Sequence, residues 1–191
     1  MKSIEIITVL DRSGSMQSLH SDSVGQFNQY IEDQKKAGIK AKVTLTVFDE
    51  NHSVLRERVK LKDCEPMAVE EAMPRGSTAL NDAIGRAITN AKQDKPTIML
   101  IMTDGGENAS KEYTTESVKA LVKEKEESGL EFKFFGAGID AFSVGGGYGM
   151  KRSSYVNVTA DAKGMEARSF AMSTATHDFA QSFKKDDSGQ G

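Results

Sequence analysis

The chain has 191 residues, 38% of them hydrophobic and 28% charged, which is the composition of an ordinary soluble protein and excludes a disordered or membrane-spanning chain. The formal charge is −3, and lysines and arginines alternate with acids in stretches such as LRERVKLKD. This pattern excludes a general nucleic-acid binder, which needs a basic stripe to neutralise phosphates. The length suits one domain, which we expect over residues 1–183, followed by a disordered tail over residues 184–191 that lacks apolar side chains.

The number of cysteines and the first apolar run indicate the cellular compartment. Cys64 is the single cysteine, so neither an internal disulfide nor a zinc ribbon or redox pair is possible. The apolar run over residues 4–10 is interrupted by Glu5 and stopped by Asp11, so it is too short and too polar for a signal-peptide core or a membrane span. We therefore expect a cytoplasmic protein that makes no membrane contact.

The first two predicted elements are a strand and a helix. Residues 4–10 form a near-continuous apolar run, which is typical of a central strand buried on both faces. Val24, Phe27 and Ile31 are spaced by three and four residues, so they share one helical face, and Gly38 ends this pattern.

The middle of the chain predicts a pair of strands, a helix and a further strand. Residues 42–48 alternate as in a half-buried strand, and the turn DENH leads into residues 53–61, whose charged side chains suit an antiparallel edge strand. Isoleucines, leucines and alanines over residues 80–91 form an apolar helical stripe, and residues 97–102 form a second buried strand.

The last third continues the alternation. Residues 114–129 predict a helix, residues 131–139 a third central strand, residues 154–159 an edge strand and residues 165–183 a final helix. Strands separated by helices of this length imply right-handed crossovers. We therefore predict an α/β fold with a doubly wound, mostly parallel sheet, one antiparallel edge strand and helices on both faces.

Three polar clusters fall where a doubly wound fold places its ligands, at the carboxyl ends of the strands. They are the stretches DRSGS at residues 11–15, RGSTAL at residues 75–80 and TDGGEN at residues 103–108. Together they offer five oxygen-bearing side chains without histidine or cysteine: Asp11, Ser13, Ser15, Thr78 and Asp104. Hard oxygens of this kind suit Mg²⁺ or Mn²⁺ and are a poor match for zinc or copper. Each cluster also has a structural interpretation, because Asp11, Ser13, Ser15 and Thr78 are residue types that cap helices and TDGG suits a turn.

At these positions the chain resembles the von Willebrand factor A (VWA) family. DRSGSM resembles the family's DxSxS signature, and Thr78 in GSTAL and Asp104 in TDGGEN stand at the places of its remaining metal-site residues. The resemblance implies a metal-ion-dependent adhesion site (MIDAS), at which a bound Mg²⁺ or Mn²⁺ takes an acidic residue of a partner protein as a ligand. The GAGIDAF stretch and the final helix are similar to those of small stand-alone bacterial and phage members.

Two alternative functions remain open at this point. In a haloacid-dehalogenase-type phosphatase, Asp11 would be the nucleophile, but this chemistry needs a second carboxylate two residues on, where the chain has Ser13. In a scaffold, the metal would only stiffen the loops. We predict a non-enzymatic, cation-dependent protein-interaction module that captures an acidic residue of its partner.

The remaining motifs give weaker predictions. VGGGYGMKRSS lacks the order of a nucleotide-binding loop, so we interpret it as a mobile connection after the strand 131–139, placed where Tyr148 could reach a partner. Asp49 and Asp140 each follow a predicted strand, and loop capping is the expected role of both. The three histidines fall in separate segments without paired spacing, so we assign them no catalytic or metal role.

Overall fold

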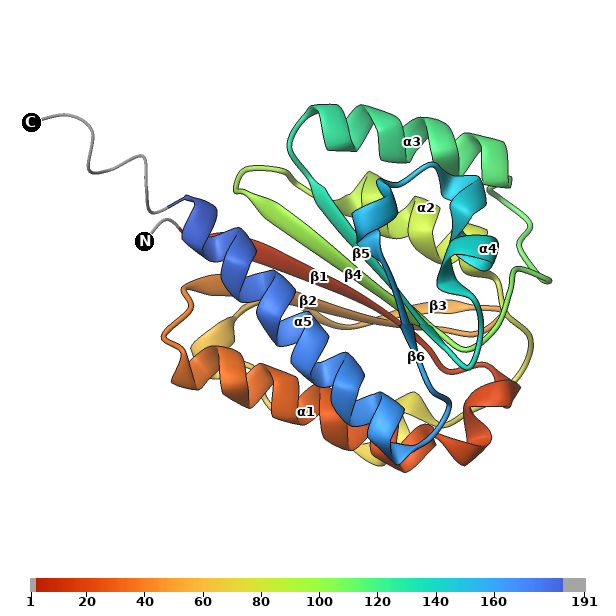
Figure 1. Cartoon of the computed structure of the whole chain (residues 1–191), viewed down its shortest axis with the longest axis horizontal. Coiled ribbons are helices and arrows are strands. Elements are labelled where there is room, and N and C mark those ends of the chain that lie inside the picture. The colour runs from red at the N-terminus through yellow and green to blue at the C-terminus, as the bar shows by residue number, and fades with distance from the viewer. Residues whose placement is uncertain (1–2, 184–191) are drawn as a thin grey trace, which may run out of the picture.

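A six-stranded sheet runs through the centre of the molecule (Figure 1), with its strands in the order β3-β2-β1-β4-β5-β6. This computed structural model describes residues 3–183. Neighbouring strands are parallel except β2 and β3, which form an antiparallel pair at one edge. The strands are β1 (Ile4–Asp11), β2 (Ala41–Phe48), β3 (His52–Lys60), β4 (Thr97–Thr103), β5 (Glu131–Ala137) and β6 (Tyr155–Val158).

Helices cover both faces of the sheet, and each face has its own apolar core (Figure 1). Two long helices, α1 (His20–Lys36) and α5 (Ala162–Ser182), pack against one another on one face. The other face carries α2 (Leu80–Asn90), α3 (Thr115–Glu127) and the short α4 (Ala141–Gly145). The predicted α/β class, with a doubly wound, mostly parallel sheet and one antiparallel edge strand, is therefore confirmed.

Burial along the strands follows from this layering. Every residue of β1 and β4 is buried, because these central strands have helices on both faces. In β3, at the edge, no residue is fully buried, and four of its nine residues are charged: Arg56, Glu57, Arg58 and Lys60. A charged edge of this kind discourages pairing with the strands of other molecules.

The order of the sheet reverses between β1 and β4. These strands are hydrogen-bonded neighbours although β2, β3 and α2 lie between them in the sequence. The connections on the two sides of this point lead away to opposite edges. In folds of this kind the ligand crevice lies at such a point, outside the carboxyl ends of the strands, and we use the word crevice for this place between the loops after β1 and β4. Asp11 is the last residue of β1, and Asp104 directly follows β4.

The glycine-rich segment after β5 differs from its prediction. Residues 141–145 form α4, and residues 146–148 form a turn of 3₁₀ helix in which Tyr148 is only 2% exposed. The Tyr148 hydroxyl donates a hydrogen bond of 2.8 Å to Asn81 Oδ1 on α2. The prediction that Tyr148 contacts a partner from a mobile loop is therefore wrong, because its ring packs into the core below α2 and α3.

The predicted tail, residues 184–191, lies outside the described residues. None of the helices within residues 3–183 combines the length and the apolar character that crossing a membrane requires.

Candidate metal centre

Asp11 lies at the base of the crevice, with 2% of its surface exposed. Its Oδ1 accepts a hydrogen bond of 2.7 Å from the backbone N–H of Ser13, and its Oδ2 accepts one of 2.5 Å from Thr103 Oγ1. Both contacts follow from the sheet, because β1 and β4 run side by side and end at the same level. The carboxylate is thus fixed in orientation while each oxygen keeps a free lone pair.

The serine hydroxyls connect the loop after β1 with the loop after β4. Ser13 Oγ and Ser15 Oγ lie 3.0 Å apart and are hydrogen-bonded to each other. Ser15 Oγ in turn donates a hydrogen bond of 2.6 Å to Asp104 Oδ1. Ser13 is buried and Ser15 is exposed, so this short chain of oxygens runs from the interior of the crevice to its mouth.

Thr78 reaches the same place on a third loop. The carbonyl of Gly76 accepts a hydrogen bond of 3.1 Å from the N–H of Gly14, and Thr78 exchanges two hydrogen bonds with Asn108, one through its N–H and one through its carbonyl. A Cβ atom added to Gly105 would lie 3.7 Å from Thr78 Oγ1 and 3.9 Å from Ser15 Oγ. These distances place both hydroxyls at the Gly105 backbone, so the structure brings all five predicted side chains into one crevice.

Helix capping does not account for these hydroxyls. Ser13 precedes the 3₁₀ helix Gly14–Ser18, but its side chain makes no capping hydrogen bond. Helix α1 is preceded by Leu19 and α2 by Ala79, neither of which caps with its side chain. The structural interpretation of Ser13 and Thr78 as helix caps is therefore wrong, and their hydroxyls are left for another role.

Burial makes the two carboxylates costly to ionise. It raises the pKa of Asp11 to about 6, with a smaller contribution from the charge of Asp104, against the lowering effect of the hydrogen bonds from Thr103 and Ser13. Burial also raises the pKa of Asp104, while Ser15 and the charge of Arg168 lower it. A cation in the crevice would favour both charged forms, so the site is electrostatically incomplete with protein groups alone.

The donor set fits a hard divalent cation. Within residues 3–183 no three histidine, cysteine, aspartate or glutamate side chains gather as metal ligands, so a metal here would depend on the three hydroxyls as well as the two carboxylates. Ligands at about 2.1 Å from an octahedral Mg²⁺ lie about 3.0 Å from each other along an edge. The Ser13–Ser15 separation of 3.0 Å matches this edge, and the Ser15–Asp104 separation of 2.6 Å is somewhat shorter.

An ion-pair network around the Asp49 carboxylate, which the sequence interpretation missed, connects two of the loops that carry the candidate ligands. Asp49, at the end of β2, is fully buried and its Oδ2 accepts hydrogen bonds from Arg12 Nε at 2.9 Å and Arg75 Nε at 2.8 Å. Its Oδ1 accepts the N–H of Asn51, which is the expected loop contact. Asp49 therefore ties the loop of Asp11 to the loop of Thr78, because Arg12 and Arg75 belong to these two loops.

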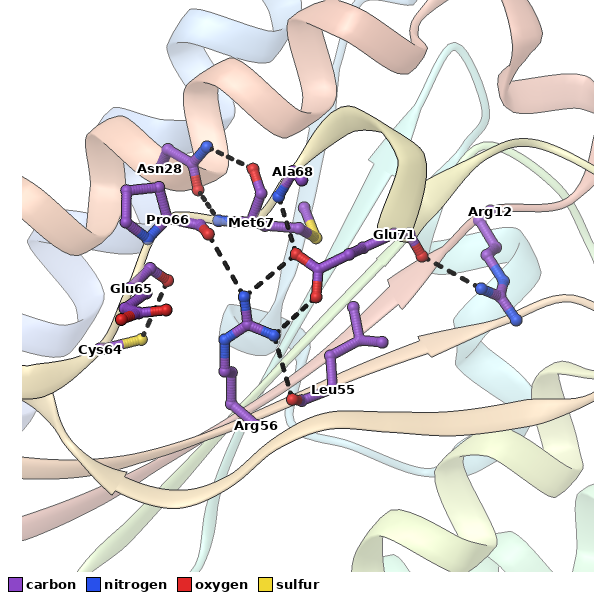
Figure 2. Close-up of polar contacts among 10 residues, drawn as sticks. All are labelled: Arg12, Asn28, Leu55, Arg56, Cys64, Glu65, Pro66, Met67, Ala68 and Glu71. Atoms are coloured by element: carbon purple, nitrogen blue, oxygen red, sulfur yellow. Dashed lines mark hydrogen bonds and ion pairs between the residues drawn. The ribbon is translucent and has the colours of Figure 1, made fainter.

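The segment between β3 and α2, which ends in the Thr78 loop, is held by a second set of contacts (Figure 2). The Glu71 carboxylate accepts hydrogen bonds from both Nη atoms of Arg56, at 2.7 and 3.0 Å, and the Glu71 carbonyl accepts one of 3.1 Å from Arg12 Nη1. Nearby, the Asn28 side chain on α1 exchanges two hydrogen bonds with the backbone of Met67. Arg12 thus contacts both Asp49 and this segment, which restricts where the Thr78 loop lies.

No protein-family model matches this chain, and no curated protein sequence matches it. Solved structures with the same fold do exist. Proximal thread matrix protein 1 from the mussel byssus superposes with a TM-score of 0.69 at 14% identity, over 90% of this chain and 45% of that one. The pilus adhesin SpaC from Lactobacillus rhamnosus GG gives a TM-score of 0.73 at 15% identity, over 96% of this chain and 30% of that one.

A third neighbour matches almost end to end. The conserved hypothetical protein BatB from Bacteroides thetaiotaomicron superposes with a TM-score of 0.61 at 15% identity, over 91% of this chain and 99% of that one. The chain spans less than half of the mussel and Lactobacillus proteins. At such low identities the similarities show the fold, which is VWA-like. A further structure of the mussel protein is described as having a zinc-occupied MIDAS motif.

Proposed function

We propose that this chain is a divalent-cation-dependent protein-interaction module that captures an acidic residue of a partner protein. The proposed ligands of Mg²⁺ or Mn²⁺ are the five side chains of the crevice: Asp11, Ser13, Ser15, Thr78 and Asp104. The observation that carries the proposal is the convergence of three loops on this point with two serine hydroxyls and a carboxylate in direct contact. A bound ion with an open coordination position would supply a site that favours a carboxylate oxygen over a neutral ligand.

The protein groups have distinct proposed roles. Asp11 is buried and is oriented by two hydrogen bonds, so its proposed role is to hold the ion from the interior side of the crevice, directly or through water. Ser15 is exposed and Asp104 half-buried, so these two lie at the mouth of the crevice, where a partner side chain would approach. The names of the structural neighbours, an adhesin and a thread matrix protein, are compatible with an interaction role.

Catalysis is not part of this proposal. A phosphatase that uses Asp11 as nucleophile needs a carboxylate oxygen that a phosphoester can reach, whereas Asp11 is 2% exposed, and the position of the general acid two residues on holds Ser13. A scaffold with a purely structural metal is the nearer alternative, because the same ligands would staple the three loops without an external one. The two binding alternatives differ in whether partner affinity depends on the metal.

The experiment begins with capture from the native host's lysate, in Mg²⁺ and in chelator, to isolate the partner. The isolated partner is then titrated against wild type and Thr78→Ala in both conditions. We expect tight binding only for wild type in Mg²⁺, and a matching loss when the contacting Asp or Glu of the partner is replaced. Such a charged contact, desolvated at an interface, is worth about 2 to 5 kcal/mol when truncated. Equal affinity in all four conditions would leave the metal as a structural staple and overturn the proposal.

A further inference from the structure

A cavity of about 370 Å³ lies between helix α2 and strands β1 to β3, and none of its lining residues belongs to the metal centre. This volume falls in the range of about 300 to 1,000 Å³ that is usual for small-molecule sites. Part of its wall is apolar and consists of Ile7, Val54, Ala87 and Ala91. The cavity exists because α2 packs against β1 and β2 and leaves the face of β3 partly open.

Buried polar atoms without a hydrogen-bond partner gather at this cavity. Glu5, His52 and Arg58 line it, and their Oε2, Nε2 and Nε atoms are three of the six such side-chain atoms found within residues 3–183. Glu5 is only 1% exposed. Buried polar groups are nearly always satisfied in folded proteins, since an unmade hydrogen bond costs free energy. Their concentration at one cavity points to a molecule that supplies the missing partners.

The backbone is distorted in a way that directs Arg58 to this place. Arg58 has φ 50°, a left-handed conformation that is rare for a bulky side chain. The pairing of β2 with β3 shifts register between Val43 and Leu45, and the N–H of Arg58 bonds the Thr44 hydroxyl at 3.2 Å. Irregularities of this kind re-aim a side chain at the edge of a sheet. Here the result is a guanidinium 3.0 Å from Glu5 Oε2.

The charges around Glu5 and Arg58 restrict the kind of ligand. Arg58 Nη2 is hydrogen-bonded to Asp94 and lies 3.0 Å from Glu5 Oε2, with which it forms an ion pair. An anionic group placed here would face Glu5, and a cationic group would face Arg58. The Arg58 Nε–H has no acceptor, and the neighbouring Glu5 oxygen can accept a hydrogen bond beside its ion pair with Arg58. A neutral group with an adjacent donor and acceptor satisfies both.

We infer that this cavity binds a small neutral molecule, in which a carboxamide-type group pairs with Glu5 and Arg58 and an apolar ring contacts Ile7, Val54 and Ala87. The ring would lie against the α2 wall, and a further polar atom would reach His52 at the other end of the cavity. The inference is independent of the metal centre, because the two sites share no residue.

Three probes with the same ring test the class of ligand: benzamide, benzamidine and benzoate. Each is titrated into the ¹⁵N-labelled full chain, and the shifted amide resonances locate the binding. We expect benzamide to shift the amides around Glu5, Arg58 and Ala91 and to bind about fivefold or more tightly than either charged probe. A preference for benzamidine or benzoate, or the absence of any shift in this region, would overturn the inference.

Two variants examine the site itself. Ala91→Leu places a larger apolar side chain in the wall of the cavity, and Ala120→Leu, on the exposed face of α3, is its matched control. We expect benzamide binding to be lost in Ala91→Leu and retained in Ala120→Leu. Glu5→Gln removes the negative charge, so it should bring benzoate up to the affinity of benzamide. Retained binding in Ala91→Leu would contradict the inference even if Glu5→Gln does not fold.

Discussion

Asp49 is completely buried at the end of β2 and accepts hydrogen bonds from the Nε atoms of Arg12 and Arg75. Burial alone would raise its pKa, but the hydrogen bonds from Arg75 and Asn51 and the charge of Arg12 lower it below the ordinary value. The carboxylate is thus kept ionised as the anchor of two loops, which explains why it lies next to the metal centre without being one of the proposed ligands.

Asp49→Ala should therefore destabilise the fold by about 3 to 5 kcal/mol, because it leaves the buried Arg12 guanidinium without its counter-ion. Urea denaturation at pH 7 measures this change. Glu112→Ala, which breaks an exposed pair with Arg86, is the control and should move the midpoint far less. Similar losses in both variants would contradict an anchoring role for Asp49.

Asp11 gives the metal-free protein a characteristic pH dependence. Its folded-state pKa of about 6 lies above the value of about 3.9 for an unfolded chain, so the folded state holds this proton more tightly. The associated stability is present in full below about pH 4 and is lost as the pH rises through 6. In chelator, wild type should lose about 1 kcal/mol more than Asp11→Asn between pH 5 and pH 7.5. The same pH dependence in both proteins, by urea denaturation, would refute this assignment.

At the residue scale, the five candidate ligands were predictable because their spacing and their position after buried strands are properties of the sequence. The residues that form hydrogen bonds and ion pairs around these ligands could not be predicted. Thr103 ends a buried strand and donates to Asp11, and Arg12 pairs with Asp49 from 37 residues away. Both contacts depend on which strands are neighbours, which local patterns do not specify. A threonine directly before Asp104 at the end of an apolar run was the available signal.

At the scale of elements, two helical glycines differ in whether the surrounding structure has room for a side chain. A Cβ atom on Gly164, near the start of α5, would lie 1.8 Å from the Thr159 carbonyl oxygen. A Cβ atom on Gly25, in α1, would meet nothing within 4 Å. The start of α5 thus requires glycine, because the chain after β6 turns back closely against the helix.

Gly164→Ala should destabilise the protein by about 1 to 3 kcal/mol through this clash. Gly25→Ala should stabilise it by about 0.5 to 1 kcal/mol, because alanine favours the helix and meets no obstacle. Thermal and urea denaturation of the two variants measure both signs. A stabilising effect of Gly164→Ala would show that the turn before α5 is less closely packed than the structure indicates.

The glycine-rich segment after β5 shows why some elements escaped prediction. Three consecutive glycines indicate a loop, yet residues 141–148 form short helical turns that are fixed by Tyr148 bonding to Asn81 on α2. Gly145 lets the backbone of this segment lie directly against the Tyr155 ring, since an added Cβ would be 2.7 Å from that ring. Tertiary packing overrides local propensity at this segment, and nothing in the local sequence indicates it.

For the molecule as a whole, the alternation of strands and helices was sufficient to predict the doubly wound sheet, and the reversal of strand order between β1 and β4 positions the candidate metal centre. We expect its two carboxylates to destabilise the fold when no cation is bound, because burial raises the pKa of both. Mg²⁺ at a hundred times its dissociation constant should add about 2.7 kcal/mol of stability. Melting curves in chelator and in millimolar Mg²⁺ measure this shift. Asp11→Ala should lose the shift and, in chelator, melt higher than wild type.

The most direct measurement is a titration with Mn²⁺ followed by electron paramagnetic resonance. The sharp signal comes from the free hydrated ion, so its amplitude falls as Mn²⁺ binds to the protein. We expect wild type to bind one ion per chain. Ser15→Ala should weaken binding, because it removes the hydroxyl between Ser13 and Asp104, whereas Ser18→Ala, an exposed serine three residues further on, should leave it unchanged. Undiminished free signal with wild type at millimolar Mn²⁺, or equal affinity in wild type and Ser15→Ala, would contradict a metal centre at these five residues.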